Sequence, residues 1–220
     1  MKIGHMHEMN HYYKDGHFVR DIDDVKGLDL LVIWGGTDIN PRIYEQIPWK
    51  ASPPDIDRDQ RESRCVVRAI SLKIPILGIC RGSQLLCALL GGELWQHVDN
   101  HGYGSHLTKL TRDFPGFPAD REVVMTTSHH QMMIPTKEME ILAYTHNRCT
   151  LKERMQGTSK ITSHQAEIEP EIVFSSRYRA LMIQGHPEYC SSSHEFSGLT
   201  TVLVKELLGV TLETTQPVPA

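Results

Sequence analysis

The segment Gly78-Ile79-Cys80-Arg81-Gly82 constrains the fold of this 220-residue chain more than any other. This segment lies at the end of residues 74–79, an almost continuously apolar run. Such a run is typical of a strand buried on both faces of a parallel sheet. Helix-forming residues 83–90 follow, and Gly91-Gly92 ends them. Glycines two positions before and two after Cys80 permit a crowded strand-to-helix turn that lifts the central side chain out of the backbone. The sequence therefore predicts a strand, a sharp turn and a helix, with Cys80 at the turn.

A cysteine at such a turn is a candidate nucleophile. Unpaired N–H groups and the dipole at the start of the following helix favour the thiolate of Cys80 over the thiol. The alternative is that Cys80 is a small buried apolar residue, as we expect for Cys65 and Cys87, which fall on apolar helix faces. With Cys149 and Cys190 the cysteines number five, and no Cys-x-x-Cys pair occurs. This argues against a disulfide framework and against a zinc ribbon.

A thiolate nucleophile needs a base to move a proton and a third group to orient that base. His186 and Glu188 follow the apolar run that ends at Gln184, and only Pro187 separates them. In an extended stretch both side chains project the same way, so the carboxylate can orient the imidazole. The alternative interpretation is a turn that carries a surface acid. Cys80 lies upstream at the sharp turn of residues 78–82, which we call the elbow, and its presence favours the catalytic interpretation.

Alternating apolar and helical segments predict an α/β sandwich with a mainly parallel central sheet. The expected strands are residues 28–34, 74–79, 123–125, 141–144, 172–174 and 180–184, and the expected helices are 59–72, 83–90 and 192–208. Residues 41–57 read as a long loop, 93–116 as a broken pattern of glycine, histidine and polar residues, and 145–170 as mostly polar. With no repeat or linker, we expect one domain over residues 1–220 with a flexible tail at 209–220.

The charge and the apolar content of the chain limit the kinds of partner it is expected to bind. The net charge is −4 with a pI near 6.3, and lysine and arginine form no block, so nucleic acid and acidic membranes are not expected partners. No run approaches the roughly 20 apolar residues of a membrane span, and the start of the chain has no apolar signal segment. We therefore expect a cytoplasmic protein.

Histidines raise the question of a metal. They gather in the N-terminal stretch and again near residue 100: His5, His7, His11, His17, His97, His101 and His106. Imidazole is the commonest zinc ligand, but none of these spacings matches a compact ligand motif with a carboxylate partner. The sequence therefore predicts no metal site.

Taken together, the motifs resemble the class I glutamine amidotransferase superfamily, and within it the γ-glutamyl-γ-aminobutyrate hydrolase type, peptidase C26. The segments that carry the resemblance are residues 30–41 (LLVIWGGTDINP), Arg58-Asp59, 76–84 (ILGICRGSQ), His129-His130-Gln131 and 183–188 (IQGHPE). The sequence departs from the family pattern at Trp34, Gly185 and Thr126-Thr127, and few residues precede the first expected strand. These departures predict a changed pocket shape more than changed chemistry.

The resemblance implies a flavodoxin-like three-layer sandwich with a small additional antiparallel strand region, and no cofactor. Cys80 would be the nucleophile, His186 the general acid and base, and Glu188 the orienting carboxylate. Backbone N–H groups of Arg81 and of the Gly35-Gly36 turn would receive the oxyanion. The residues expected to contact a γ-glutamyl substrate are Gln84, His129, His130 and Gln131.

Three hypotheses about function stay open. The first is a hydrolase that cleaves γ-glutamyl amide bonds, in glutamine or a γ-glutamyl amide, through a thioester. The second is a glutaminase subunit that delivers ammonia to a separate synthetase or ligase partner. The third is a non-catalytic binding module on the same fold. The amine side of the substrate and the assembly state, including a homodimer, stay open as well.

Overall fold

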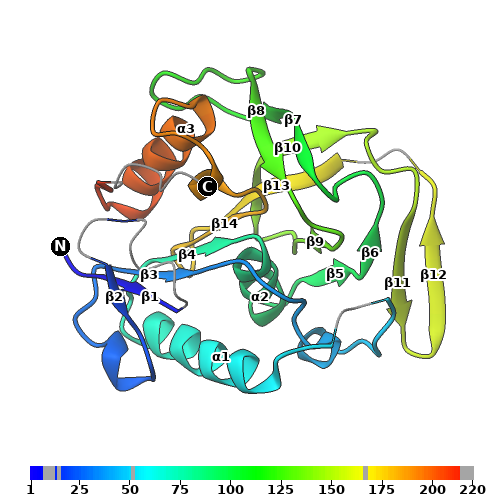
Figure 1. The fold of residues 1–220 in the computed structure, drawn as a ribbon, viewed down its shortest axis with the longest axis horizontal. Helices are drawn as coiled ribbons and strands as arrows, with labels where there is room; N and C mark the ends of the chain where they lie inside the picture. The colour runs from blue at the N-terminus through cyan, green and yellow to red at the C-terminus, as the bar shows by residue number, and fades with distance from the viewer. Residues whose placement is uncertain (7–12, 14–15, 51–52, 166–167, 214–220) are drawn as a thin grey trace.

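The computed structural model describes residues 1–6, 13, 16–50, 53–165 and 168–213. A nine-stranded sheet crosses the molecule (Figure 1). Its strands in spatial order are β2 (Gly16–Phe18), β1 (Ile3–His5), β3 (Leu30–Ile33), β4 (Ile76–Ile79), β14 (Ala180–Ile183), β13 (Ile168–Ser175), β10 (Glu140–His146), β7 (Gly104–Leu110) and β8 (Glu122–Thr127).

The sheet has a parallel half and an antiparallel half. Neighbours from β2 through β14 pair in parallel, and neighbours from β14 through β8 pair antiparallel. All residues of β3, β4 and β14 are buried, because helices cover both faces of this half. Their near-continuous apolar sequence follows from that burial.

Helices lie on both faces and complete three layers (Figure 1). Helices α1 (Ile56–Ser71) and α2 (Arg81–Leu89) cover one face. Helix α3 (Glu195–Leu203), continued by a π-helical turn at Val204–Leu208, covers the other. Alternate residues of the parallel strands point into two separate cores, one with α1 and α2 and one with α3. The predicted α/β sandwich is confirmed, and its antiparallel strands extend the central sheet.

Two segments expected to be irregular contain strands, which corrects the sequence prediction. Residues 93–116 hold β5 (Glu93–Trp95), β6 (His97–Val98) and β7, and residues 145–170 hold the hairpin of β11 (Lys152–Gln156) and β12 (Ser159–Ser163). β5 pairs with β9 (Met132–Ile134), and β6 pairs with β11. Ion pairs of Glu153 with Lys50 and Lys160 stabilise β11, so apolar alternation does not reveal it.

The ends of the chain and the expected loop also differ in detail from the pattern. A 3₁₀ helix, η2 (Pro41–Tyr44), occupies part of residues 41–57. Val210 and Leu212, at the start of the expected tail, are buried in the α3-side core, and residues 214–220 lie outside the described part of the chain. No helix in the described residues is long and apolar enough to cross a membrane.

Replacement of Gly82 by alanine tests how tightly the elbow is packed. A Cβ at Gly82 would lie 2.0 Å from the carbonyl oxygen of Ile33, so β3 and α2 would have to separate. We expect Gly82→Ala to lower the free energy of unfolding by about 1–3 kcal/mol, measured by urea denaturation. Gly102→Ala is the matched control, because a Cβ there meets nothing within 4 Å, and its change should stay within about 0.5 kcal/mol. Equal stability of the two variants would contradict this packing.

Candidate active site

Cys80 occupies the sharp turn between β4 and α2 in a strained backbone conformation. Its φ of 50° and ψ of −110° are rare for a residue with a side chain. Its N–H donates to the carbonyl of Ile183 at 2.8 Å, and its carbonyl accepts from Gln84 N–H at 3.1 Å and from the Ser83 hydroxyl at 2.6 Å. These contacts, from the neighbouring strand and the first turn of α2, hold the side chain away from the backbone.

The flanking glycines are required by crowding. A Cβ at Gly78 would lie 2.6 Å from the carbonyl oxygen of Gly82, and a Cβ at Gly82 would meet the carbonyl of Ile33. The predicted reason for both glycines is therefore confirmed. Strand β3 ends beside the elbow, so the Gly35-Gly36 turn that follows it lies against Cys80.

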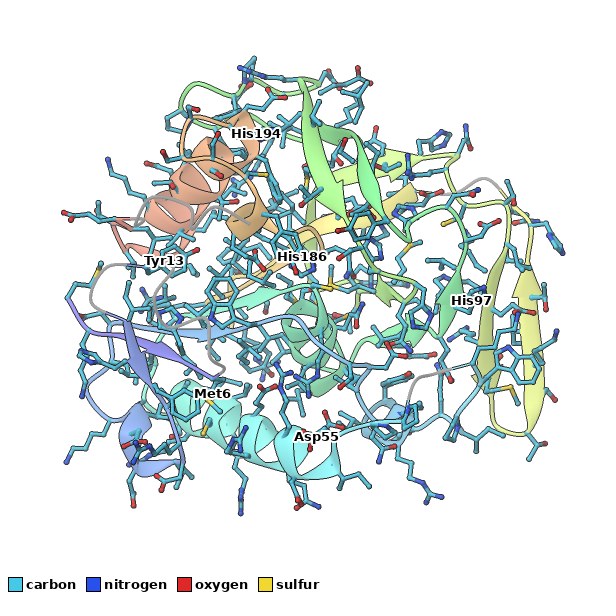
Figure 2. All side chains as sticks on the ribbon, in the orientation of Figure 1. Met6, Tyr13, Asp55, His97, His186 and His194 are labelled. Atoms are coloured by element: carbon cyan, nitrogen blue, oxygen red, sulfur yellow. The ribbon has the colours of Figure 1, made fainter. Side chains whose placement is uncertain are left out.

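The imidazole of His186 lies between that turn and Glu188. Figure 2 shows His186 near the middle of the molecule, and its side chain is buried. Its Nδ1 is 2.7 Å from Oε1 of Glu188, whose side chain is also buried. The sequence predicted an extended stretch for His186 and Glu188, and this prediction is wrong. Pro187–Tyr189 forms a 3₁₀ turn that carries the carboxylate back to the imidazole.

Thr126 and Tyr189 position His186. The N–H of His186 donates to the Thr126 hydroxyl at 2.8 Å, and that hydroxyl donates to the His186 carbonyl at 3.0 Å. The ring of Tyr189 stacks on the imidazole with centroids 4.4 Å apart and planes 3° apart. Thr126, one of the departures from the family pattern, thus fixes the backbone, and Tyr189 fixes the ring.

The site holds His186 in its protonated form. Burial alone lowers the pKa of His186, but hydrogen bonds with Cys80 and Glu188, and the negative charges of both, raise it to about 10. The imidazole of His186 is therefore protonated at neutral pH and lies between the side chains of Cys80 and Glu188.

The Gly35-Gly36 turn has no room for side chains. A Cβ at Gly35 would lie 2.8 Å from Cε1 of His186 and 3.5 Å from Cβ of Cys80. Gly36 has a φ of +148°, and a Cβ there would lie 2.3 Å from Nη1 of Arg58. That guanidinium donates to the carbonyls of Trp34 at 3.2 Å and Gly35 at 3.0 Å. Arg58 therefore secures the turn that the sequence analysis linked to the oxyanion.

The side chain of Arg81 points away from the cavity. It is almost fully buried and pairs with Asp59 and Glu62 of α1. Glu62 also accepts from Nε of Arg58 at 2.8 Å. Arg81 therefore anchors the elbow to α1 through its side chain, and only its backbone N–H is available at the elbow.

A small cavity of about 150 Å³ opens beside Cys80. All four residues expected to contact substrate line it, and the complete lining is Gly36, Thr37, Asp38, Cys80, Gln84, Ser128, His129, His130 and Gln131. The His130 imidazole lies 3.0 Å from the Asp38 carboxylate, and this hydrogen bond raises the pKa of His130. Burial lowers the pKa of His129 to about 3. The cavity wall thus carries the Asp38–His130 pair and a neutral His129.

The remaining cysteines and His5 contribute packing. Cys65, Cys87, Cys149 and Cys190 are free and buried, and burial raises the pKa of Cys87 to about 12. His5 accepts a hydrogen bond from the Trp34 indole at 2.9 Å and stacks on that ring, which gives the unusual Trp34 a partner. His17 lies exposed in β2, and His7 and His11 are outside the described residues.

Comparison with known proteins places this geometry in a family. Protein NtpR of Enterococcus hirae is 28% identical over 184 residues, which are 81% of this chain and 75% of NtpR. A glutamine-hydrolyzing GMP synthase of Staphylococcus aureus is 37% identical over 75 residues, which are 33% of this chain and 14% of the synthase. A glutamine amidotransferase structure from Thermotoga maritima has the same fold, with a TM-score of 0.56, 15% identity and coverage of 94% of this chain and 87% of that one.

The family model of peptidase C26 matches residues 14–188, a range that includes the elbow, the Gly-Gly turn, the cavity wall and the His-Pro-Glu segment. This match covers most of the chain, and the mixed sheet with its two helical layers agrees with it. The chain therefore belongs to the peptidase C26 family of the class I glutamine amidotransferase superfamily.

Proposed function

We propose that this protein hydrolyses γ-glutamyl amide bonds through a thioester on Cys80. Membership in the superfamily supports hydrolysis of glutamine-type amides. The observation that carries the finer proposal is the buried line of Cys80, His186 and Glu188 beside a cavity of about 150 Å³. A protein that only binds its ligand would not need a thiol, a protonated imidazole and a carboxylate in that order.

The proposed acylation uses the charges already in place. The Cys80 thiolate attacks the γ-carbonyl carbon and forms a C–S bond, and the carbonyl oxygen becomes an oxyanion. N–H groups of Arg81 and of the Gly35-Gly36 turn stabilise that oxyanion. As the C–N bond breaks, His186 gives its proton to the amine, which leaves, and the thioester remains.

Hydrolysis of the thioester reverses the role of His186. The negative charge of Cys80 is one of the causes that raise the pKa of His186, and acylation removes it. The pKa of His186 is therefore lower in the thioester, and the imidazole stays neutral after it has lost its proton. It then takes a proton from water, whose oxygen attacks the carbonyl carbon, and the C–S bond breaks to release glutamate and restore the thiolate.

The cavity supports the same proposal. We propose that Gln84, His129, His130 and Gln131 form the wall against which the γ-glutamyl group lies. The Gln84 amide donates to the carbonyl of Gln131 at 3.3 Å, which joins α2 to the segment before β9. The wall is therefore fixed before substrate arrives.

A glutaminase subunit is the second candidate, because the chain is locally similar to a glutamine-hydrolyzing GMP synthase. In that case a synthetase partner would receive the ammonia. Such a protein is expected to be weakly active alone, because its partner would order the site.

Replacement of Cys80 tests the nucleophile. We expect Cys80→Ala to lower amine or ammonia release by at least about 10⁴-fold, because the thioester requires the sulfur. Release is measured from L-glutamine, γ-glutamyl-γ-aminobutyrate and a chromogenic γ-glutamyl anilide. Cys65→Ala, at a buried cysteine of α1 outside the site, is the control and should keep wild-type release.

The pattern across these substrates separates the functions. Release from the substituted amides by wild type alone supports a free-standing hydrolase. Ammonia from glutamine alone favours the synthetase subunit. Undiminished release by Cys80→Ala would exclude the thioester, and no release by wild type from any substrate favours the binding module.

The pKa of His186 predicts the alkaline limit of activity. Its folded value of about 10 exceeds the ordinary 6.5, so the imidazolium persists below pH 10 and is lost as the pH rises through that value. We expect kcat/KM to fall with an apparent pKa near 10, because acylation needs that proton. Glu188→Gln removes a charge that raises this pKa, so the fall should move to lower pH. Glu206→Gln, on the exposed surface, is the control and should leave the alkaline fall of kcat/KM where it is in wild type. If the fall in Glu188→Gln occurs at the same pH as in wild type, the role of Glu188 is refuted.

A further inference from the structure

A second cluster of ionisable side chains lies behind the cavity wall. His101 and His106 come from the segment around β7, His129 from the segment after β8, and Glu169 and Glu171 from β13. All five side chains are buried, and His101 is 0% and Glu171 1% exposed. The proposed hydrolysis uses none of their titratable groups, so the cluster needs its own account.

One nitrogen of His101 and one of His129 have partners that point away from the centre of the cluster. Nε2 of His101 lies 2.9 Å from Oε2 of Glu169, whose other oxygen accepts the backbone N–H groups of Arg148 and Cys149. Nδ1 of His129 lies 2.9 Å from the carbonyl of Gln131. A carboxylate and a carbonyl only accept, so both of these ring nitrogens carry their hydrogen outward.

His106 is oriented in the same way. Its Nδ1 is 2.9 Å from the hydroxyl of Thr145, and that hydroxyl donates to the carbonyl of Leu107 at 2.9 Å. Nδ1 of His106 also lies 3.2 Å from the Thr108 hydroxyl, so its polar neighbours lie on the outer side of the ring. Its Nε2 points inward, toward Glu171.

Three ring nitrogens converge on one carboxylate. Nδ1 of His101 and Nε2 of His106 lie 3.4 and 3.2 Å from Oε1 of Glu171, and Nε2 of His129 lies 3.9 Å from its Oε2. Each of these nitrogens, and Oε2 itself, is buried and makes no hydrogen bond of good geometry within the described part of the chain. Buried polar atoms without hydrogen bonds are costly, and a cation at the centre of the cluster would pair with all of them.

The spacing suits a tetrahedral metal ion. Zinc bonds of 2.0–2.1 Å place tetrahedral ligand atoms about 3.3 Å apart, close to the distances from Oε1 of Glu171 to His101 and His106. The inward atoms of His101, His106 and Glu171 all lie within 4.8 Å of one another. Outer acceptors such as Glu169 are the usual partners of metal-bound imidazoles, whose orientation they fix.

We propose that His101, His106 and Glu171 bind one divalent transition-metal ion of the zinc type. Nε2 of His129 lies 3.9 Å from Oε2 of Glu171, outside the group formed by the other three ligand atoms, and moves inward to fill the fourth position. Three imidazoles and a carboxylate then give a closed, structural site. The spacing of these residues along the chain does not indicate a metal site. The ligands come from three separate segments, and only the fold brings them together.

The ion would brace the cavity wall beside Cys80. His129 belongs both to the lining of that cavity and to the cluster. Its backbone N–H donates to the carbonyl of His101 at 2.9 Å, and the Thr127 hydroxyl donates to the same carbonyl at 2.7 Å. Metal binding would join this segment to β7 and β13 by coordinate bonds.

Zinc content of the untagged full-length chain tests the proposal. The protein is stripped with a chelator, mixed with excess ZnCl₂, separated from free metal and analysed by mass spectrometry of the metal. Wild type should retain one zinc per chain. His106→Gln and Glu171→Gln should bind zinc at least about 100-fold more weakly, since even outer partners of a ligand are worth 10–100-fold. His146→Gln, at an exposed histidine at the end of β10, is the matched control and should bind like wild type.

Cobalt gives a readout that does not depend on the variants folding. Co²⁺ in this site should give wild type the intense visible absorption of four-coordinate cobalt, and His146→Gln should keep it. Folded wild type that retains no zinc would overturn the proposal and show that protons neutralise the cluster. Equal zinc in wild type and His106→Gln would also overturn it, because the metal would then lie elsewhere.

Discussion

The close crossing of the elbow with its two neighbouring strands is the constraint on which the site depends. Cys80 keeps a φ of 50° because its N–H is bonded to β14 and its flanking glycines let α2 start directly against β3. β3, β4 and β14 are adjacent and parallel, so their carboxyl ends meet at one edge of the sheet. The Gly35-Gly36 turn, Cys80 and His186 follow these three strands and therefore meet there.

Buried charge holds this edge to α1. Arg58 and Arg81 share Glu62, Arg81 also pairs with Asp59, and Arg58 reaches the carbonyls of the Gly-Gly turn. Buried ion pairs add little net stability, because desolvation offsets their attraction, yet loss of one partner leaves an uncompensated charge. We therefore interpret the network as a determinant of geometry. It fixes the turn and the elbow relative to one helix.

The parts predicted from sequence are those in which a local pattern and the fold agree. Residues 30–33, 76–79 and 180–183 are continuously apolar because they are buried on both faces, and the glycine spacing around Cys80 reflects backbone contacts. The hairpin of β11 and β12 was missed because ion pairs stabilise its polar residues. The contact of Thr126 with His186 and the clustering of His101 with His106 and Glu171 were not predicted, because these partners are distant in sequence and meet only in the folded sheet.

A histidine held by a carboxylate occurs both at the Cys80 site and in the cluster around His101. In each centre a carboxylate fixes one nitrogen of an imidazole, Glu188 for His186 and Glu169 for His101. What faces the other nitrogen then decides the role. His186 faces Cys80, and in the proposed hydrolysis the ring moves protons during turnover. His101 faces the carboxylate of Glu171 together with the inward nitrogens of His106 and His129, and in the proposed metal site one bound cation would pair with all of them.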